Sequence, residues 1–298
     1  MKIITQYIVF FIFLAVIAAA QNVKTGFPFL KTGASAQALG MGETVSAFSL
    51  ESGAQFYNPA LLASFKNSEL SLSHKAMFAE TSTEYLAAVI AGSTFSYGVA
   101  LNSTSVRNIE IRTQPGPAEG TFSARDFSLG ISAATKFLDD IQIGVTAKFL
   151  YEKIFVDEAS GYGIDFGGMY FVAKTFALTA SVNNLGSMNA MRNVNPTLPA
   201  SIHAGASSFL PITEQFSALG NVDIVKTLDD NLSHFHFGTE ISYEQNIKLR
   251  LGYLTGYAGK GFSTGVGFQY SVITFNYAYV PMTASFSPSH VFTIGFIL

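Results

Sequence analysis

Few ionisable side chains of this 298-residue chain stand at spacings that support catalysis. Residues 257–261 read Tyr-Ala-Gly-Lys-Gly, which is similar to a phosphate-binding loop, but Leu254 takes the place of its first glycine and Gly261 that of its serine or threonine. The HExxH and GxSxG motifs do not occur, and a chain without cysteine has no thiol nucleophile. The sequence therefore argues against an enzyme.

The five histidines offer little metal-binding or acid–base chemistry. His234 and His236 are two positions apart and share a face of an extended segment, but no third ligand is near them in sequence, so we expect neither a metal site nor a cofactor. We expect both near the outer rim of the fold. His74, His203 and His290 leave only the remote option of a hydrolase assembled from distant segments.

Oppositely charged residues stand where neighbouring strands would bring them together. A turn centred between Lys153 and Ser160 would place Lys148 opposite Asp165. Such pairs inside a barrel either line a polar path or ligand site, or simply fill the lumen. A second group of this kind, on two adjacent strands, comprises Glu240, Glu244, Lys248 and Arg250.

The strands that would hold these side chains are visible as about fourteen runs of about ten residues, between Glu69 and Leu298, in which apolar residues alternate with small or polar ones. In one run, residues 141–151 carry apolar side chains at every odd position, whereas Thr146 and Lys148 lie between them. A membrane barrel strand has one face in lipid and the other in the lumen. The pattern predicts an all-β fold, a transmembrane antiparallel β-barrel of about 14 strands.

The composition agrees with this fold class. Apolar residues make up 49% of the chain and charged residues 12%, yet after the first 20 residues no apolar stretch is long enough for a spanning helix. The 28 Phe, 13 Tyr and 26 Gly are spread over short runs, as in strands that present aromatic side chains to lipid. The formal net charge of −3 gives no basis for nucleic-acid binding.

The first residues have the pattern of a secretory signal. Lys2 precedes an apolar core at 3–17, and three alanines end at Ala20, after which we expect cleavage. The alternative, a membrane anchor, needs a longer apolar run. With the barrel pattern, the signal predicts an integral protein of a bacterial outer membrane. The predicted organisation is a signal peptide at 1–20, an N-terminal plug segment at 21–68 and an outer-membrane barrel at 69–298.

The connections between the predicted strands alternate in length. Long ones, at 107–124, 184–199 and 226–233, all fall on one side, whereas the turns on the other side are tight. Outer-membrane barrels have short periplasmic turns and longer external loops, and a soluble β-sandwich, the alternative fold, has no such asymmetry. The longest loops are expected to be contact surfaces, and the arginines in or beside them are Arg107, Arg112, Arg125 and Arg192.

The segment before the first strand has weak helical potential and many apolar side chains, including Leu39, Met41 and Phe56. Leaving these in water would forgo their burial free energy, so we expect the segment to form a partly helical plug inside the barrel. Asn58 and Pro59 predict a capped helical turn.

Within this segment, residues 38–42 (Ala-Leu-Gly-Met-Gly) and 56–60 (Phe-Tyr-Asn-Pro-Ala) resemble the N-terminal signature of FadL-like barrels, and more closely that of the PorV/PorQ family. The chain departs from that signature at Glu43, where glycine is common. The resemblance implies a fourteen-stranded barrel and a role beside the type IX secretion translocon of Bacteroidota-like bacteria. It also implies a plug built around a motif of Gly40, Met41, Gly42, Asn58 and Pro59.

Two functions follow. In the first, the chain is an accessory component of a secretion machine, and it binds a large translocon barrel or secreted proteins with C-terminal sorting domains. In this role it would also contact outer-membrane lipid or lipopolysaccharide. In the second, it is a FadL-like transporter of hydrophobic small molecules, which requires an apolar pocket in the lumen and a lateral opening in the wall. The inward residues that can be assigned, such as Gln142, Thr146 and Asn276, are polar and small, which favours the first function.

Overall fold

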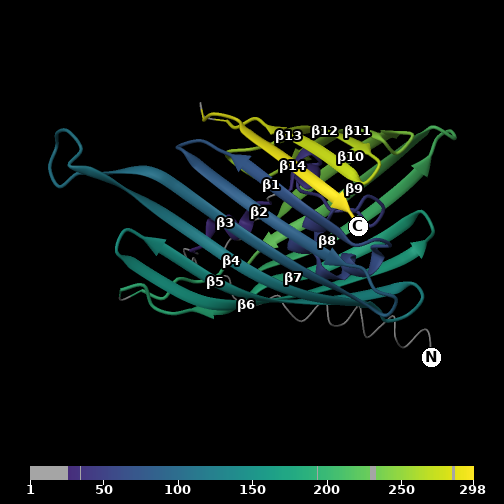
Figure 1. The fold of residues 1–298 in the computed structure, drawn as a ribbon, viewed down its shortest axis with the longest axis horizontal. Helices are drawn as coiled ribbons and strands as arrows, with labels where there is room; N and C mark the ends of the chain where they lie inside the picture. Colours follow the sequence, from purple (N-terminus) through teal and green to yellow (C-terminus); the bar gives the residue numbers. More distant parts are fainter. Residues whose placement is uncertain (1–25, 34, 193, 229–232, 284–285) are drawn as a thin grey trace.

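The computed structural model describes residues 26–298 except 34, 193, 229–232 and 284–285 (Figure 1). The expected signal peptide at 1–20 lies outside the described residues. Among the helices in the described part of the chain, none is long and apolar enough to cross a membrane.

Fourteen strands form one closed antiparallel barrel, so the predicted fold class is confirmed. Each strand pairs with its neighbours in sequence, and the first strand pairs with the last from Glu69–Ile297 to Ala76–His290. The strands are β1 (Glu69–Ala76), β2 (Thr81–Ile90), β3 (Phe95–Ile111), β4 (Gly120–Lys136), β5 (Ile141–Ile154), β6 (Asp157–Ala173), β7 (Phe176–Met188), β8 (Ser201–Pro211), β9 (Phe216–Thr227), β10 (His234–Tyr243), β11 (Ile247–Leu254), β12 (Phe262–Tyr270), β13 (Ile273–Val280) and β14 (Ser289–Ile297).

The side chains alternate between the two faces of the wall as the sequence pattern requires. Along β10, His234 and His236 are buried while Phe235 and Phe237 are exposed. The exposed positions of the other strands are likewise largely Phe, Tyr, Leu, Ile and Val. In water these side chains would be unfavourable, so they form the surface that faces lipid, and the buried positions face the lumen.

The described residues before β1 fold inside the barrel, and we call residues 26–68 the plug (Figure 1). The plug contains η1 (Pro28–Lys31), α2 (Ala36–Gly40), η2 (Ser52–Phe56) and η3 (Pro59–Ser64). Ser35 caps α2 by accepting a hydrogen bond from the Ala38 backbone, and Asn58 caps η3 by accepting one from Ala60. Proline at the first position of η3 has no N–H to lose, which favours a helix start there.

The connections form two rims. At the turn rim the strands are joined by short segments such as 174–175 and 271–272, whereas the loop rim carries longer ones such as 189–200. Because outer-membrane barrels place short turns in the periplasm, the loop rim is assigned to the outside.

The predicted loop at 107–124 is wrong in extent. β3 continues to Ile111 and β4 starts at Gly120, so only 112–119 connects them, and this hairpin projects beyond the rest of the loop rim in Figure 1. A bulge between Val106 and Ile109, with Asn108 at φ 54°, shifts the register and interrupts the alternation that the prediction relied on. Similarly, β7 extends to Met188, past the predicted loop start at 184.

Candidate functional site

Arg250 ties the plug to the wall on the β10–β13 side of the lumen. It is 1% exposed, and its Nε donates to Glu240 Oε2 at 2.7 Å. Its Nη1 donates to Asn276 Oδ1 at 2.8 Å, and its Nη2 to Gln37 Oε1 of the plug at 3.4 Å. Glu240 and Arg250 are direct partners across β10 and β11. A buried ion pair whose remaining donors are also bonded is the arrangement that offsets the cost of desolvating both charges.

The other members of this predicted group are distributed differently. Lys248 Nζ lies 3.9 Å from Glu240 Oε1, and Ser49 of the plug donates to Glu240 Oε2 at 3.3 Å. Glu244 is exposed in the tight turn before β11, so including it in the group was wrong. The alternation ends at that turn, where the φ of Glu244 is 48°, and its side chain is therefore not directed by the strand.

Lys148 and Asp165 form a second buried ion pair, with Lys148 Nζ 2.6 Å from Asp165 Oδ2. The expectation that they lie directly opposite each other was wrong. Lys148 lies opposite Gly163, and Asp165 lies opposite Thr146. The strands pair as far as Ile154 and Asp157, which moves the turn one residue earlier than the expected centre. The long lysine side chain spans the resulting diagonal, a reach that cross-strand geometry allows.

Two further cations hold the plug near the loop rim. Lys75 on β1 donates to Gly33 O at 2.7 Å and to Thr32 Oγ1 at 3.1 Å. Lys260, in the loop between β11 and β12, pairs with Glu43 of the plug. Burial acts to raise the pKa of Glu43, but the Lys260 and His236 charges and the hydrogen bond from Lys260 together outweigh it, and the pKa is lowered below its ordinary value.

Glu51 of the plug is the one carboxyl here for which we predict a pH effect. Burial and the nearby Glu69 carboxylate raise its pKa to about 7 from an ordinary 4.5, although Asn276 donates to its Oε2 at 3.4 Å. The unfolded chain loses this proton at lower pH than the folded chain, so stability falls as pH rises, by about 1 kcal/mol between pH 6 and pH 8. Urea midpoints at both pH values, read by the gel mobility of the folded barrel, measure this difference. With Glu51→Gln the stability should change with pH by about 1 kcal/mol less over this range than in the wild type, and an unchanged pH dependence in that variant would contradict the prediction.

Where the first half of the predicted plug motif contacts the barrel wall, both the plug and the wall contribute glycines. Gly42 has φ 66°, and a Cβ there would lie 2.8 Å from the Phe237 carbonyl oxygen. Gly40 packs in the same way against Gly265 of β12, since a Cβ on it would lie 3.1 Å from the Gly265 Cα. Met41, between them, is 1% exposed. Gly40 and Gly42 contact the backbone of the wall. A side chain at either position would clash with that backbone.

The second half of the motif rests on β5 and β6. Asn58 Nδ2 donates to Gly168 O at 3.1 Å, beyond its capping role. A Cβ on Gly144 would lie 2.5 Å from the Pro59 carbonyl carbon, and one on Gly167 would lie 2.0 Å from Asn58 Oδ1. The sequence reasoning did not single out these wall glycines. Their signal was present, because both stand at lumen-facing positions of the alternation.

The plug meets β2–β5 through apolar and small side chains, and we call this contact the seam. Its centre is a cavity of about 20 Å³, room for about one water. The plug and wall residues that line it are apolar or small on one part of its surface, namely Leu30, Phe56, Tyr85, Ala100 and Gly130, and polar on the rest, namely Gln55, Ser128, Ser132, Thr146 and Lys148. Lys148 Nζ lies over the Phe56 ring, 5.8 Å from the ring centroid. The remaining members of the seam, toward the turn rim, are Leu62, Ala63, Phe65, Ala87, Val89 and Ala134.

Toward the loop rim the seam continues into an apolar cluster that shares Leu30. The other buried members of this cluster come from the plug, β5, β6, β7 and the loop after β7, and they are Phe27, Phe29, Leu150, Ala159, Met188 and Leu198. Apolar side chains therefore extend from the loop rim to the centre of the lumen.

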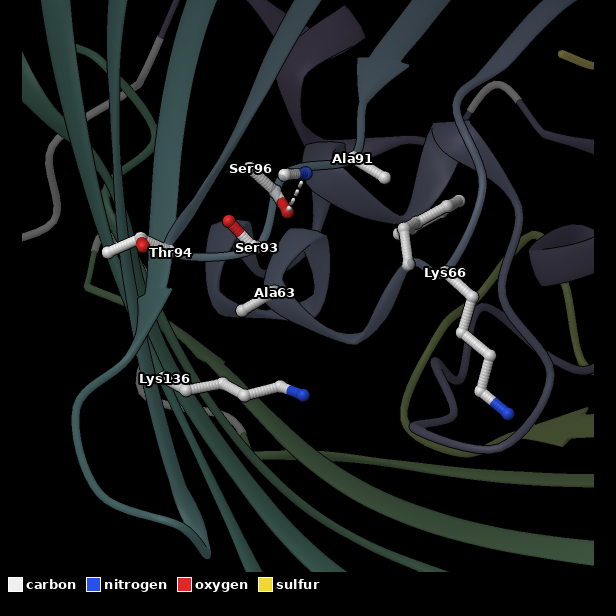
Figure 2. A pocket seen from close by; sticks show the side chains of 9 residues that line it. Ala63, Lys66, Ala91, Ser93, Thr94, Ser96 and Lys136 are labelled. Atoms are coloured by element: carbon white, nitrogen blue, oxygen red, sulfur yellow. Dashed lines mark hydrogen bonds between the residues drawn. The ribbon is translucent and has the colours of Figure 1, made fainter.

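At the turn rim the seam ends in a cavity of about 370 Å³ (Figure 2). It lies between the end of the plug and the β2–β3 turn, and Figure 2 shows the Lys136 side chain extending beneath Ala63. Gly92 and Ser96 also line this cavity, and Gly92 N donates a hydrogen bond to Ser96 Oγ at 3.4 Å. The side-chain ammonium groups of Lys66 and Lys136 make no hydrogen bond or ion pair with any described residue.

The structure does not gather the predicted rim arginines into one site. Arg112 Nε donates to Glu110 Oε2 at 2.8 Å, and Arg192 Nε lies 2.7 Å from Asp157 Oδ2. Arg107 and Arg125 lie in β3 and β4 rather than in a loop, because both strands are longer than predicted.

The histidines are also separate. His234 and His236 both contact Tyr257, by ring stacking at 4.0 Å and by a 2.9 Å hydrogen bond. No described group of three or more His, Asp or Glu side chains has the geometry of a metal site. The other three histidines lie on different strands and contact different residues, His74 with Glu84, His203 with Ser201 and His290 with Tyr277.

Comparisons with known proteins agree on the architecture. The family model described as "Family of unknown function (DUF5723)" matches residues 91–253. A comparison with curated proteins gives no match. The CymD monoaromatic hydrocarbon channel is similar in structure, with 15% identity, a TM-score of 0.66 and coverage of 89% of this chain and 97% of that one. The Ralstonia pickettii toluene transporter TbuX has 14% identity, a TM-score of 0.62 and coverage of 89% and 98%. A Pseudomonas aeruginosa FadL homologue has 11% identity, a TM-score of 0.53 and coverage of 93% and 99%. The fold is thus that of FadL-like outer-membrane barrels.

Proposed function

We propose that this chain, which belongs to the family of unknown function DUF5723, transports a hydrophobic small molecule across the outer membrane along the seam between its plug and β2–β5. The observation that carries the proposal is the asymmetry of the plug contacts. On the side of β10–β13 the plug is held by the Glu43–Lys260 ion pair and by the hydrogen bond from buried Arg250 to Gln37. On the side of β2–β5 its contacts are mainly apolar, and the polar ones are hydrogen bonds between uncharged groups, such as that from Ser132 to Gln55.

Charged contacts resist sliding, because moving one partner leaves the other buried and unpaired. Apolar contacts are non-directional and are exchanged for contacts with an apolar guest at little cost. A hydrophobic molecule would therefore enter among Phe27, Phe29 and Leu30, pass between Phe56 and Ala100, and leave at the cavity of the turn rim.

The seam is closed at its centre, since about 20 Å³ holds no hydrocarbon of useful size. Transport thus requires the plug face at Phe56 to separate from the wall while the ionic side stays fixed. All fourteen strands are paired into a closed ring, so this route does not use the lateral opening in the wall that the sequence reasoning required of a transporter.

The similar structures support this function over a secretion role, because they are those of a monoaromatic hydrocarbon channel and a toluene transporter. The secretion role implied by the PorV/PorQ resemblance is the second candidate. One observation favours it, namely the exposed apolar tip of the β5–β6 hairpin, where Phe155 is 52% and Val156 68% exposed. An exposed apolar patch at a rim is a typical contact for a protein partner.

Uptake of 1-N-phenylnaphthylamine, a hydrophobic dye that intact outer membranes exclude, tests the proposal. Cells that express the chain should take up the dye faster than cells with an empty vector. Ala100→Leu, which adds bulk at the closed centre of the seam, should reduce the rate to that of the vector.

Ala133→Leu is the matched control, because Ala133 lies on the opposite, lipid-facing side of the wall, between Tyr97 and Val145. It should leave uptake unchanged. Uptake no faster than the vector, together with co-purification of a larger barrel or of secreted proteins, would overturn the proposal in favour of the secretion role.

A further inference from the structure

Three cations lie together on the lipid-facing side of the barrel at the loop rim. Arg125 on β4 is the direct partner of Lys153 on β5 and of Ser105 on β3. Arg107 follows Ser105 by two positions and lies at the bulge of β3. Arg107, Arg125 and Lys153 are all exposed, and we call them the cation cluster.

The height of the cluster on the wall follows from the apolar row beneath it. On β5 the outward side chains from Ile141 to Tyr151 are all apolar and precede Lys153. On β3 the outward apolar row runs from Phe95 to Leu101, and two serines follow it before Arg107. Ten residue steps span about 33 Å along a strand, and a tilt of about 40° reduces this to about 25 Å, the height of the apolar band of an outer-membrane barrel. The cluster therefore stands at the level of the lipid headgroups.

The positive charge of the cluster exceeds the negative charge that the protein places beside it. Among described residues, no carboxylate lies within ion-pair distance of any of the three side chains. Glu158 is the direct partner of Lys153 across β5 and β6, but it makes no ion pair with it and accepts a hydrogen bond from Tyr151 at 2.8 Å. Three cations thus stand beside one carboxylate. Like charges on adjacent strands repel, so a compensating anion at this position would stabilise the barrel.

We propose that the cation cluster binds the phosphates of a lipid A headgroup in the outer leaflet. The loop rim faces outward, and the glycolipid of that leaflet carries phosphates at the headgroup level where the cluster stands. Arginine matches phosphate oxygens with two parallel N–H donors, and Ser105 adds a hydroxyl beside Arg125. Below them Phe127 and Tyr151, themselves partners across β4 and β5, present rings to the acyl chains.

The test uses the full chain, purified and placed in phosphatidylcholine nanodiscs, with bisphosphorylated lipid A as the probe. The wild type should retain about one lipid A per barrel in native mass spectrometry. The triple variant Arg107→Gln, Arg125→Gln, Lys153→Gln should bind it about tenfold more weakly. Dephosphorylated lipid A should bind as weakly to the wild type as lipid A does to the triple variant.

Lys226 provides the control, since it stands at the end of the outward row of β9, beside Ile202 and away from the cluster. Lys226→Gln should bind lipid A as the wild type does. Equal binding by the triple variant and the wild type, or equal binding of dephosphorylated lipid A, would overturn the proposal. So would binding of inorganic phosphate that depends on the cluster without retention of lipid A. The gel mobility of each variant verifies that it is folded.

Discussion

Replacing Arg250 with methionine is expected to destabilise the folded barrel by about 3–5 kcal/mol, because it leaves the Glu240 carboxylate buried without its main partner. The change also removes the donors to Asn276 and to Gln37, so one wall contact and one plug contact are lost together. Urea titration followed by gel mobility measures the loss.

The double variant Arg250→Met, Glu240→Leu separates the cost of an unpaired charge from that of lost packing. Replacing both partners of a buried pair with apolar residues is often neutral, so the double variant should recover most of the loss. Arg112→Met is the matched control, since its pair with Glu110 is about half exposed, and it should change stability by less than about 1 kcal/mol. A single Arg250 variant as stable as the control would show that the buried pair does not hold the plug.

The barrel itself could be predicted because its signal is local. Each lipid-facing position must be apolar whatever its neighbours are, and so the run at 141–151 determines its own two faces. The charged residues could be paired for a related reason. An inward charge in a closed lumen needs a partner, and few are available to Lys148 or Arg250.

The remaining features depend on contacts that the alternation does not encode. The one-residue shift of the β5–β6 turn and the bulge near Asn108 change pairing without changing the apolar pattern. The seam joins plug residues to strands far along the chain, as in the packing of Phe56 against Tyr85. Its apolar wall residues were not recognised in the sequence because inward polar residues such as Ser128 and Ser132 stand beside them, and only polar and small inward residues were assigned there.

Gly144→Val is expected to displace η3 from the wall while leaving the barrel closed. A Cβ at this position would lie 2.5 Å from the Pro59 carbonyl carbon and 2.6 Å from the Ala60 nitrogen, and these backbone atoms cannot yield as a side chain can. Valine is favourable in a strand, so the β5 pairing should survive. Ala60 is 0% exposed, and because the chain has no cysteine, Ala60→Cys gives a single reporter. Its reaction with a maleimide should be about tenfold faster with Gly144→Val than without it.

Gly220→Val is the matched control, because a Cβ at Gly220 meets nothing within 4 Å and the residue faces outward on β9. It should leave the reporter unreactive. The same pair of variants bears on transport, since a displaced η3 opens the seam at Leu62 and Ala63. Dye uptake should then rise above that of the wild type with Gly144→Val and stay unchanged with Gly220→Val. A reactive cysteine without faster uptake would mean that the plug moves but does not gate a path, and the seam would then be a packing interface and not a route.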